Sequence, residues 1–248
     1  MPLRKKSEEQ HRTEMVEAGK RIHALGYVAA SDGNLSVRLD RERILATPTG
    51  ISKGVMSAGD LVLVSPAGKK ISGERNPSSE LAMHLLFYNS RPDVHAVVHA
   101  HPPAATGYAA AGIPLNKALI SEVVLTLGTV PLAAYGTPGT EEVTRSMAHL
   151  VREHDAILMA NHGAVTCGPD LEKAIWKMET VEHFARISLV TEILGKQSPL
   201  SECEVKKLAA ARARYAAPGA AEKTLSDETL RAVVETVVRE ILKKTGAC

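Results

Sequence analysis

The sequence has little of what marks several large protein classes. Only three of its 248 residues are cysteines, and they are widely spaced, so we expect a reduced, cytoplasmic protein without a disulfide framework. Aromatic residues make up 3% of the chain and the formal net charge is only +2, which argues against a nucleic-acid-binding surface. No apolar run approaches the roughly 20 residues of a membrane-spanning helix, and the charged first residues do not resemble a secretory signal. We therefore expect neither nucleic acid nor membrane as a partner.

What the chain does contain is a series of hairpins followed by helices. Turn residues between short apolar runs predict hairpins over 35–47 and 61–72, and buried strands over 94–101 and 156–160. Helical patterns cover residues 7–25, 78–88, 140–153, 171–194 and 201–215. Early hairpins and later helices predict an α/β fold, with a central, mainly antiparallel sheet flanked by helices on both faces.

The end of the chain differs from the domain expected over residues 1–215. Small residues, proline and glycine predict a linker over 216–225. In residues 226–248, seven apolar residues follow helical spacing and predict an amphipathic helix: Leu230, Val233, Val234, Val237, Val238, Ile241 and Leu242. A helix this short is only marginally stable alone, so we expect its apolar face to pack against a partner.

Three histidines stand where two apolar runs end. His99 and His101 close the first run, and His162 follows the second. Residues i and i+2 of a strand project from one face, so His99 and His101 can bind one ion, and His162 can complete the set. Three imidazoles with an open fourth position are the ligand set of a catalytic Zn²⁺. A lone histidine on an apolar run is more often structural, and we assign that role to His95.

Three segments carry groups that suit an anion. Ser78 and Ser79 precede Glu80 at an expected helix start, where hydroxyls and free N–H groups can hold an anion or simply cap the helix. Residues 32–34 and 47–50 combine glycine with side-chain donors, which suits a phosphate, although each alone is a common turn. A carboxylate beside a metal, such as Glu80, can also move protons to and from carbon.

Taken together and in this order, the motifs resemble the class II aldolase and adducin family, typified by L-fuculose-1-phosphate aldolase. The resemblance runs from about Val16 to Tyr215. It rests on Gly33-Asn34, Thr47-Pro48-Thr49-Gly50, Ser78-Ser79-Glu80, His99-Ala100-His101 and His162-Gly163. The combination is highly specific, although no single element is.

The resemblance implies a role for each matching position. It implies one Zn²⁺ per subunit on His99, His101 and His162, with Glu80 as the acid/base that also approaches the metal. It implies a phosphate cradle of Asn34, Thr49, Gly50, Ser78 and Ser79. It further implies a homotetramer with interface active sites, in which Tyr215 serves a neighbouring subunit. The family's second active-site tyrosine has no clear counterpart, because residues 120–123 read Ile-Ser-Glu-Val.

The implied activity is zinc-dependent retro-aldol cleavage of a deoxyketose 1-phosphate. L-fuculose 1-phosphate or L-rhamnulose 1-phosphate would give dihydroxyacetone phosphate and L-lactaldehyde. Related L-ribulose-5-phosphate 4-epimerases carry Asp where Glu80 stands, so Glu80 favours the aldolase. Sugar-acid phosphate decarboxylases and iron-dependent oxygenases remain alternatives, because they share the ligand set. An adducin-like binding scaffold is the alternative from another class, and the intact ligands argue against it.

The tail carries a second resemblance. A small-residue linker before a short amphipathic helix resembles the encapsulation peptides of bacterial microcompartment enzymes. This implies that residues 226–248 bind shell proteins and that the protein lies inside a microcompartment. A helix for oligomerisation or core packing remains the alternative.

Overall fold

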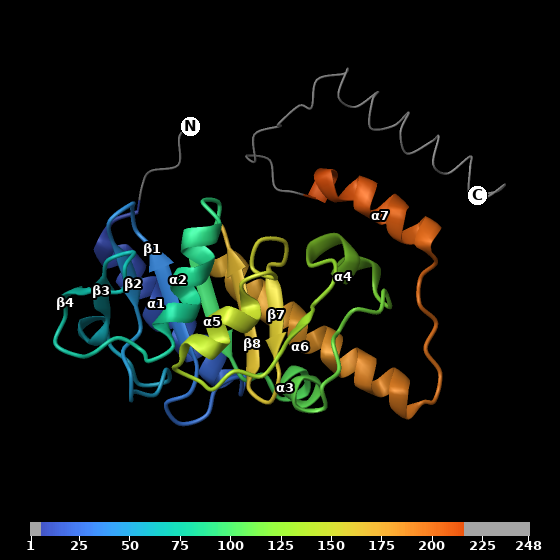
Figure 1. Ribbon diagram of the computed structural model, residues 1–248, viewed down its shortest axis with the longest axis horizontal. Helices are drawn as coiled ribbons and strands as arrows, with labels where there is room; N and C mark the ends of the chain where they lie inside the picture. The colour runs from blue at the N-terminus through green and yellow to red at the C-terminus, as the bar shows by residue number, and fades with distance from the viewer. Residues whose placement is uncertain (1–5, 216–248) are drawn as a thin grey trace, which may run out of the picture. The chain divides into compact units, whose positions relative to one another are not determined.

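Residues 6–215 are described by the computed structural model (Figure 1). The described residues divide into two compact units, residues 6–199 and residues 200–215. The predicted linker over 216–225 and the predicted helix over 226–248 lie outside the described residues. Between residues 6 and 215, no helix combines the length and apolar character that crossing a membrane requires.

The first unit is built on one sheet of eight strands, in the order β4-β3-β2-β1-β5-β8-β7-β6. The strands are β1 (Asn34–Arg38), β2 (Ile44–Ala46), β3 (Val62–Val64), β4 (Lys70–Ser72), β5 (Ala96–Ala100), β6 (Leu132–Ala133), β7 (Ala156–Met159) and β8 (Gly163–Gly168). Every neighbouring pair is antiparallel except β6 with β7. The predicted mainly antiparallel sheet is therefore confirmed, and so are both predicted hairpins.

Helices cover both faces of this sheet, as predicted (Figure 1). The helices of the first unit are α1 (Glu8–Ala24), α2 (Leu81–Ser90), α3 (Pro103–Ala110), α4 (Ser121–Thr126), α5 (Glu141–Met147) and α6 (Leu171–Ile193), and a 3-10 turn, η1, spans Ala58–Asp60. Helix α7 (Glu202–Tyr215) belongs to the second unit. Side chains alternate along β5, so Val98 joins the apolar cluster under α1, α3 and α6, whereas Val97 joins the cluster under α2 and α5. Each face of the sheet thus has its own core.

Local sequence signals explain where the long helices begin. The Ser7 hydroxyl accepts a hydrogen bond from the Gln10 amide, and the Gln10 side chain accepts one from the Ser7 amide, so both free donors are satisfied. At the start of α6 the Asp170 carboxylate accepts one hydrogen bond, from the Lys173 amide. These caps fix the two long helices that cover one face of the sheet.

Several sequence-based boundaries were wrong, and five elements were missed: η1, α3, α4, β6 and β8. The helix predicted over 78–88 begins only at Leu81, and the helix predicted over 140–153 ends at Met147, after which backbone turns hydrogen-bond back to Met147 and Leu150. The strand predicted over 94–101 spans Ala96–Ala100. Strand β8 escaped prediction because a glycine stands at each of its ends, which lowers strand propensity. Helices α3 and α4 and strand β6 are short and lack a clear period.

Candidate active site

The three histidines meet where β5 ends and where the chain turns from β7 into β8. His99 lies near the end of β5, and β1 places Asn34 directly beside it, because Asn34 and His99 are partners in the antiparallel register. His101 follows immediately after β5, where its amide donates to the Tyr27 carbonyl. His162 lies in the short turn between β7 and β8. Glu80 stands one residue before α2, on the face of the sheet that α2 covers.

The imidazoles are close enough to share one ion. One ring nitrogen from each of His99, His101 and His162 lies within 4.8 Å of the others. Among residues 6–215, these three side chains form the group whose ligand atoms lie close enough together to hold a metal ion. His99 Nε2 lies 3.2 Å from His101 Nε2. The Nδ1–H of His99 donates to the Ala164 carbonyl at 2.9 Å, which leaves the Nε2 lone pair for the centre of the cluster.

Two backbone positions hold the third histidine. Asn161 has a left-handed φ of 56°, which asparagine tolerates better than most residues, and it turns the chain from β7 into β8. At Gly163 a Cβ atom would lie 2.6 Å from the Ala100 carbonyl oxygen and 2.6 Å from the His101 ring. Only glycine fits at this position, so the His162-Gly163 pair reflects the close packing of β8 against β5.

Glu80 places its carboxylate against this cluster. Its Oε1 lies 3.2 Å from His162 Nε2, and its Oε2 lies 3.4 Å from His99 Nε2 and accepts from the Asn34 amide at 2.8 Å. Oε1 is buried without a hydrogen-bond partner among the described residues. Burial alone would raise the pKa of Glu80, but the interactions with His162, His99 and Asn34 outweigh it and hold the pKa well below its usual range. The group is therefore an ionised carboxylate with one free oxygen.

Burial lowers the pKa of two of the three imidazoles. His99 is completely buried, and desolvation lowers its pKa, although the nearby Glu80 charge opposes the effect. Desolvation likewise lowers the pKa of His101, against the opposing charge of Asp32, whose carboxylate lies 3.4 Å from His101 Nδ1. Neutral imidazole is the form that binds a metal ion. Three converging imidazoles and a carboxylate oxygen without a hydrogen-bond partner are thus a donor set that fits a divalent cation.

The five residues expected to form a phosphate cradle line one pocket beside this cluster. The pocket has a volume of about 270 Å³, and Asn34, Thr49, Gly50, Ser78 and Ser79 line it together with Glu80, His101 and His162. Two backbone hydrogen bonds join its walls, from the Thr49 amide to Asn76 and from the Ser78 amide to Thr47. The structure therefore brings the expected cradle and the histidine cluster to the same cavity.

Sequence reasoning missed two buried polar residues at this pocket: Lys53, which lines it, and His84, which contacts the lining residue Asn34. Lys53 is 1% exposed, and its Nζ donates to the Ser31 carbonyl at 2.6 Å and to the Ile51 carbonyl at 2.9 Å. Burial lowers the pKa of Lys53 to about 8, against the opposing charges of Asp32 and Glu80. His84, on α2, contacts Asn34. Neither residue belongs to a recognisable motif, so only the tertiary structure reveals them.

The remaining predicted position, Tyr215, does not belong to the unit that carries this site. Tyr215 is the last residue of α7, which belongs to the second unit, and its role in a neighbouring subunit stays a prediction. The segment 121–123, where the family's second tyrosine is missing, forms the first turn of α4. The structure thus supplies no substitute tyrosine at that segment.

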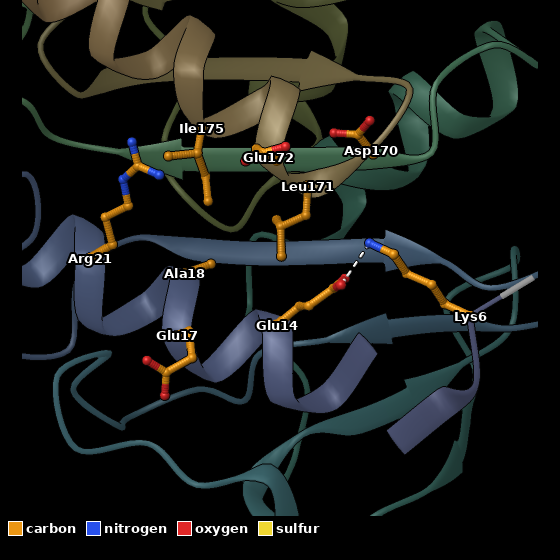
Figure 2. Close-up of a pocket in the computed structure, with 9 residues that line it drawn as sticks. All are labelled: Lys6, Glu14, Glu17, Ala18, Arg21, Asp170, Leu171, Glu172 and Ile175. Carbon is orange, nitrogen blue, oxygen red and sulfur yellow. Dashed lines mark ion pairs between the residues drawn. The ribbon is translucent and has the colours of Figure 1, made fainter. Parts of the chain in front are cut away.

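Two other clefts lack the converging ligands. One, of about 350 Å³, lies between α1 and the start of α6, where Glu14 pairs with Lys6 at 2.6 Å (Figure 2). The other, of about 550 Å³, is lined by Arg38, Tyr88 and His95 at the far end of β1. Neither brings together the set of imidazoles that distinguishes the smaller pocket.

Comparison with known proteins places this geometry in a family. Residues 13–189 match the Class II Aldolase and Adducin N-terminal domain. A 3-oxo-tetronate 4-phosphate decarboxylase of Pectobacterium atrosepticum is 37% identical over 188 residues, which cover 74% of this chain and 86% of that protein. An L-fuculose phosphate aldolase of Haemophilus influenzae is 35% identical over 178 residues, which cover 71% and 81%. The crystal structure of YgbL from Klebsiella pneumoniae superimposes with a TM-score of 0.77 at 34% identity, over 82% of this chain and 99% of that one.

Proposed function

Since the chain belongs to the class II aldolase and adducin family, we propose that it is a lyase that acts on a phosphorylated substrate with a ketone group. The carbon–carbon bond that it cleaves joins the carbon next to the ketone to the departing fragment. The first candidate substrate is a deoxyketose 1-phosphate, L-fuculose 1-phosphate or L-rhamnulose 1-phosphate. The products would be dihydroxyacetone phosphate and L-lactaldehyde. The observation that carries the proposal is the ionised Glu80 carboxylate, with one free oxygen, against three converging imidazoles.

The chemistry of the substrate explains why this arrangement is needed. The carbon next to the ketone carries a hydroxyl group and is bonded to the departing fragment. When that bond breaks, the retained fragment keeps the electron pair and becomes an enediolate. A divalent cation bound by His99, His101 and His162, for which we propose zinc, would supply Lewis-acid stabilisation of that negative charge. The chain's own task is then to hold the phosphate, exclude water and deliver a proton to carbon.

We assign those tasks to residues of the pocket. The hydroxyls and amides of Asn34, Thr49, Gly50, Ser78 and Ser79 bind the phosphate and set the position of the carbon chain. Glu80 takes up the proton that the departing aldehyde's hydroxyl releases, or in decarboxylation a proton from solvent, and delivers it to the enediolate carbon; in the condensation direction the carboxylate removes the same proton. Its free Oε1 is the atom placed for this transfer.

Decarboxylation of a 3-oxo-tetronate 4-phosphate is the second candidate function. Loss of carbon dioxide from such an acid leaves the same enediolate of dihydroxyacetone phosphate that the retro-aldol reaction leaves. The two reactions differ only in the departing fragment, an aldehyde in one and carbon dioxide in the other. An aldehyde leaves only after its hydroxyl loses a proton, which is work for a further side chain, and segment 120–123 offers no tyrosine for it. Similarity to a decarboxylase at 37% identity also favours this candidate.

Three further elements of the proposal concern the assembly. We propose a homotetramer in which Tyr215 completes the active site of a neighbouring subunit. We also propose that residues 226–248 bind the shell proteins of a bacterial microcompartment, with an oligomer-packing helix as the competing role. Deletion of residues 226–248 should leave the cleavage rate unchanged and abolish co-localisation with shell proteins, and retained co-localisation would contradict the targeting role.

One assay separates the candidate substrates. The purified protein is analysed for bound metal and then incubated with L-fuculose 1-phosphate, L-rhamnulose 1-phosphate, L-ribulose 5-phosphate and a 3-oxo-tetronate 4-phosphate. Dihydroxyacetone phosphate, lactaldehyde and carbon dioxide are quantified separately. Lactaldehyde identifies the aldolase, and carbon dioxide identifies the decarboxylase.

Controls define what would overturn the proposal. Treatment with a chelator should remove activity, and added Zn²⁺ should restore it. A protein that binds no divalent metal and releases neither lactaldehyde nor carbon dioxide would be a binding scaffold, and the lyase proposal would be wrong.

A further inference from the structure

A continuous line of buried hydrogen bonds runs from Glu80 between α2 and β1. The Asn34 amide contacts Glu80, and its oxygen contacts His84 Nε2. His84 Nδ1 lies 2.7 Å from Ser36 Oγ, which in turn lies 2.8 Å from the Tyr88 hydroxyl. Asn34 and Ser36 share one face of β1, because they are two residues apart. Four side chains thus continue the site away from the pocket and into the core.

The direction of each hydrogen bond in this line follows from Glu80. A carboxylate only accepts, so Asn34 must turn its NH₂ group to Glu80 and its carbonyl oxygen to His84. That oxygen also only accepts, so His84 Nε2 must carry a proton. His84 is fully buried and burial lowers its pKa to about 4, so the ring is neutral and Nδ1 is an acceptor.

The rest of the order is then determined. The Ser36 hydroxyl donates to His84 Nδ1, and the Tyr88 hydroxyl donates to Ser36. Every proton in the line points toward Glu80. If the Asn34 amide turned over, its carbonyl oxygen would face the carboxylate and its NH₂ group would face the protonated Nε2, so both contacts would become repulsive. His84 therefore determines which group Asn34 presents to the site.

We propose that His84 is a positioning residue. By fixing the Asn34 side chain, it keeps the Asn34 NH₂ group turned toward Glu80 and the pocket, and so holds the Glu80 carboxylate in the orientation that the reaction needs. This inference rests on the proposed function of Glu80 and Asn34. His84 neither hydrogen-bonds to a predicted metal ligand nor lines the pocket. Its effect on Glu80 therefore passes through the side-chain amide of Asn34. Ser36 and Tyr88 in turn hold the His84 ring in place. Hydrogen bonds in such a buried chain polarise one another, so each one is stronger than it would be alone.

The kinetic test compares variants of His84 with a matched control. His84→Phe removes both ring nitrogens and should lower kcat by about 10- to 100-fold, which is typical for loss of a supporting contact of this kind. His84→Gln keeps a donor for Asn34 and an acceptor for Ser36 and should recover most of the loss. Phe87→Leu, in the same helix and fully buried, perturbs packing without touching the line and should leave kcat unchanged. Equal losses of kcat in His84→Phe and Phe87→Leu would show a packing role only and overturn the proposal.

A double-mutant cycle tests the path through Asn34. If His84 acts by way of this amide, His84→Phe should cost little further rate in a protein that already carries Asn34→Ala. Independent roles would instead make the two losses of rate multiply, and that result would contradict the proposal. Bound metal is measured in each variant, and it should stay at the parent level.

A second arm does not depend on activity. The proposed order requires His84 to be neutral with its proton on Nε2, which ¹⁵N–¹H NMR of histidine-labelled protein detects, and the His84→Gln variant assigns the signal. A proton on Nδ1 would overturn the proposal whatever the enzyme does. If the protein cleaves no sugar phosphate but His84 shows the Nε2–H form, the proposed function fails while the hydrogen-bond order stands.

Discussion

Glu80 and Glu182 are carboxylates on opposite faces of the sheet; Glu80 is half-buried and Glu182 is buried. Glu182, on α6, accepts hydrogen bonds from the Ala104 and Ala105 amides at 3.0 Å each and from Arg186 Nε at 2.7 Å. These amides begin α3, so Glu182 caps a helix. Glu80 has one oxygen without a hydrogen bond and faces imidazoles. Glu182 is the more deeply buried of the two, so an acceptor oxygen without a hydrogen bond, rather than the degree of burial, distinguishes the carboxylate that can react.

The largest expected effect comes from removing the charge of Glu80. Glu80→Gln keeps the shape of the side chain but can no longer take up and deliver a proton, so proton exchange on dihydroxyacetone phosphate should fall by about 10²- to 10⁴-fold. Bound metal and the melting temperature should change little. Exchange is followed by NMR in deuterated water. Full exchange in Glu80→Gln would show that the free oxygen is not used, and the contrast with Glu182 would lose its meaning.

The opposite outcome is expected at Glu182. Glu182→Leu leaves two buried amides without acceptors and should lower the free energy of unfolding by about 1–3 kcal/mol, measured by urea denaturation. The cleavage rate per folded molecule should fall far less than in Glu80→Gln. Glu182→Gln, which keeps an acceptor, is the matched control and should lose less stability. A variant as stable as the parent but inactive would place Glu182 in the chemistry instead.

A buried cation extends the comparison. Lys53 donates to two neutral carbonyls, and because Ser31 lines the pocket and Ile51 directly follows the pocket residue Gly50, it links two walls of the cradle. Lys53→Met should raise KM for the sugar phosphate about tenfold, which corresponds to roughly 1.4 kcal/mol, with a smaller change in kcat. Lys20→Met, which removes an exposed lysine of α1, serves as the control. An unchanged KM in Lys53→Met would show that the cradle does not need this link.

The smallest effect is expected at a third carboxylate, Asp155, which pairs with Arg91 at 2.6 Å and Lys177 at 2.7 Å. Burial opposes its ionisation, but Lys177 and Arg91 outweigh burial and hold the pKa of Asp155 below its usual range. The pair therefore stabilises the fold fully above the ordinary Asp pKa of about 3.9, and this contribution is lost as the pH falls through the lower folded-state value.

Asp155→Asn should therefore lower the free energy of unfolding by no more than about 1 kcal/mol at near-neutral pH, because Arg91 keeps Asp93 as a second partner. The difference from the parent protein should shrink as the pH falls below about 4. Urea denaturation over a pH series measures both. A difference that grows on acidification would contradict the assigned direction of the pKa.

The sequence predicted the elements whose signals are local. The apolar run before His99 and the capping residues of α1 each identify their element without help from distant residues. The offset of Glu80 from its helix was not predictable in this way, because its φ of −96° and ψ of 11° depend on the loop it leaves. Strand β8 was missed because its pairing with β5, rather than its own composition, makes it a strand.

The histidine cluster and its surroundings differ in the same way. The positions of His99, His101 and His162 followed from motif spacing, and the structure brings all three together. His84 and Lys53 were invisible in the sequence. A histidine within an apolar helix and a lysine after a turn have many ordinary explanations, and only their contacts with Asn34, Ser31 and Ile51 give them a role.

The missing Cβ at Gly163 has a consequence for protein engineering. A designer who transplants the three imidazoles to another scaffold would naturally copy the ligands and leave the neighbouring backbone to the host. Here the host would also have to offer a residue without a side chain, because a single methyl group would collide with the His101 ring and with the adjoining strand. A portable version of this centre is therefore a pair of strands with its tight turn, and the three side chains alone would not reproduce it.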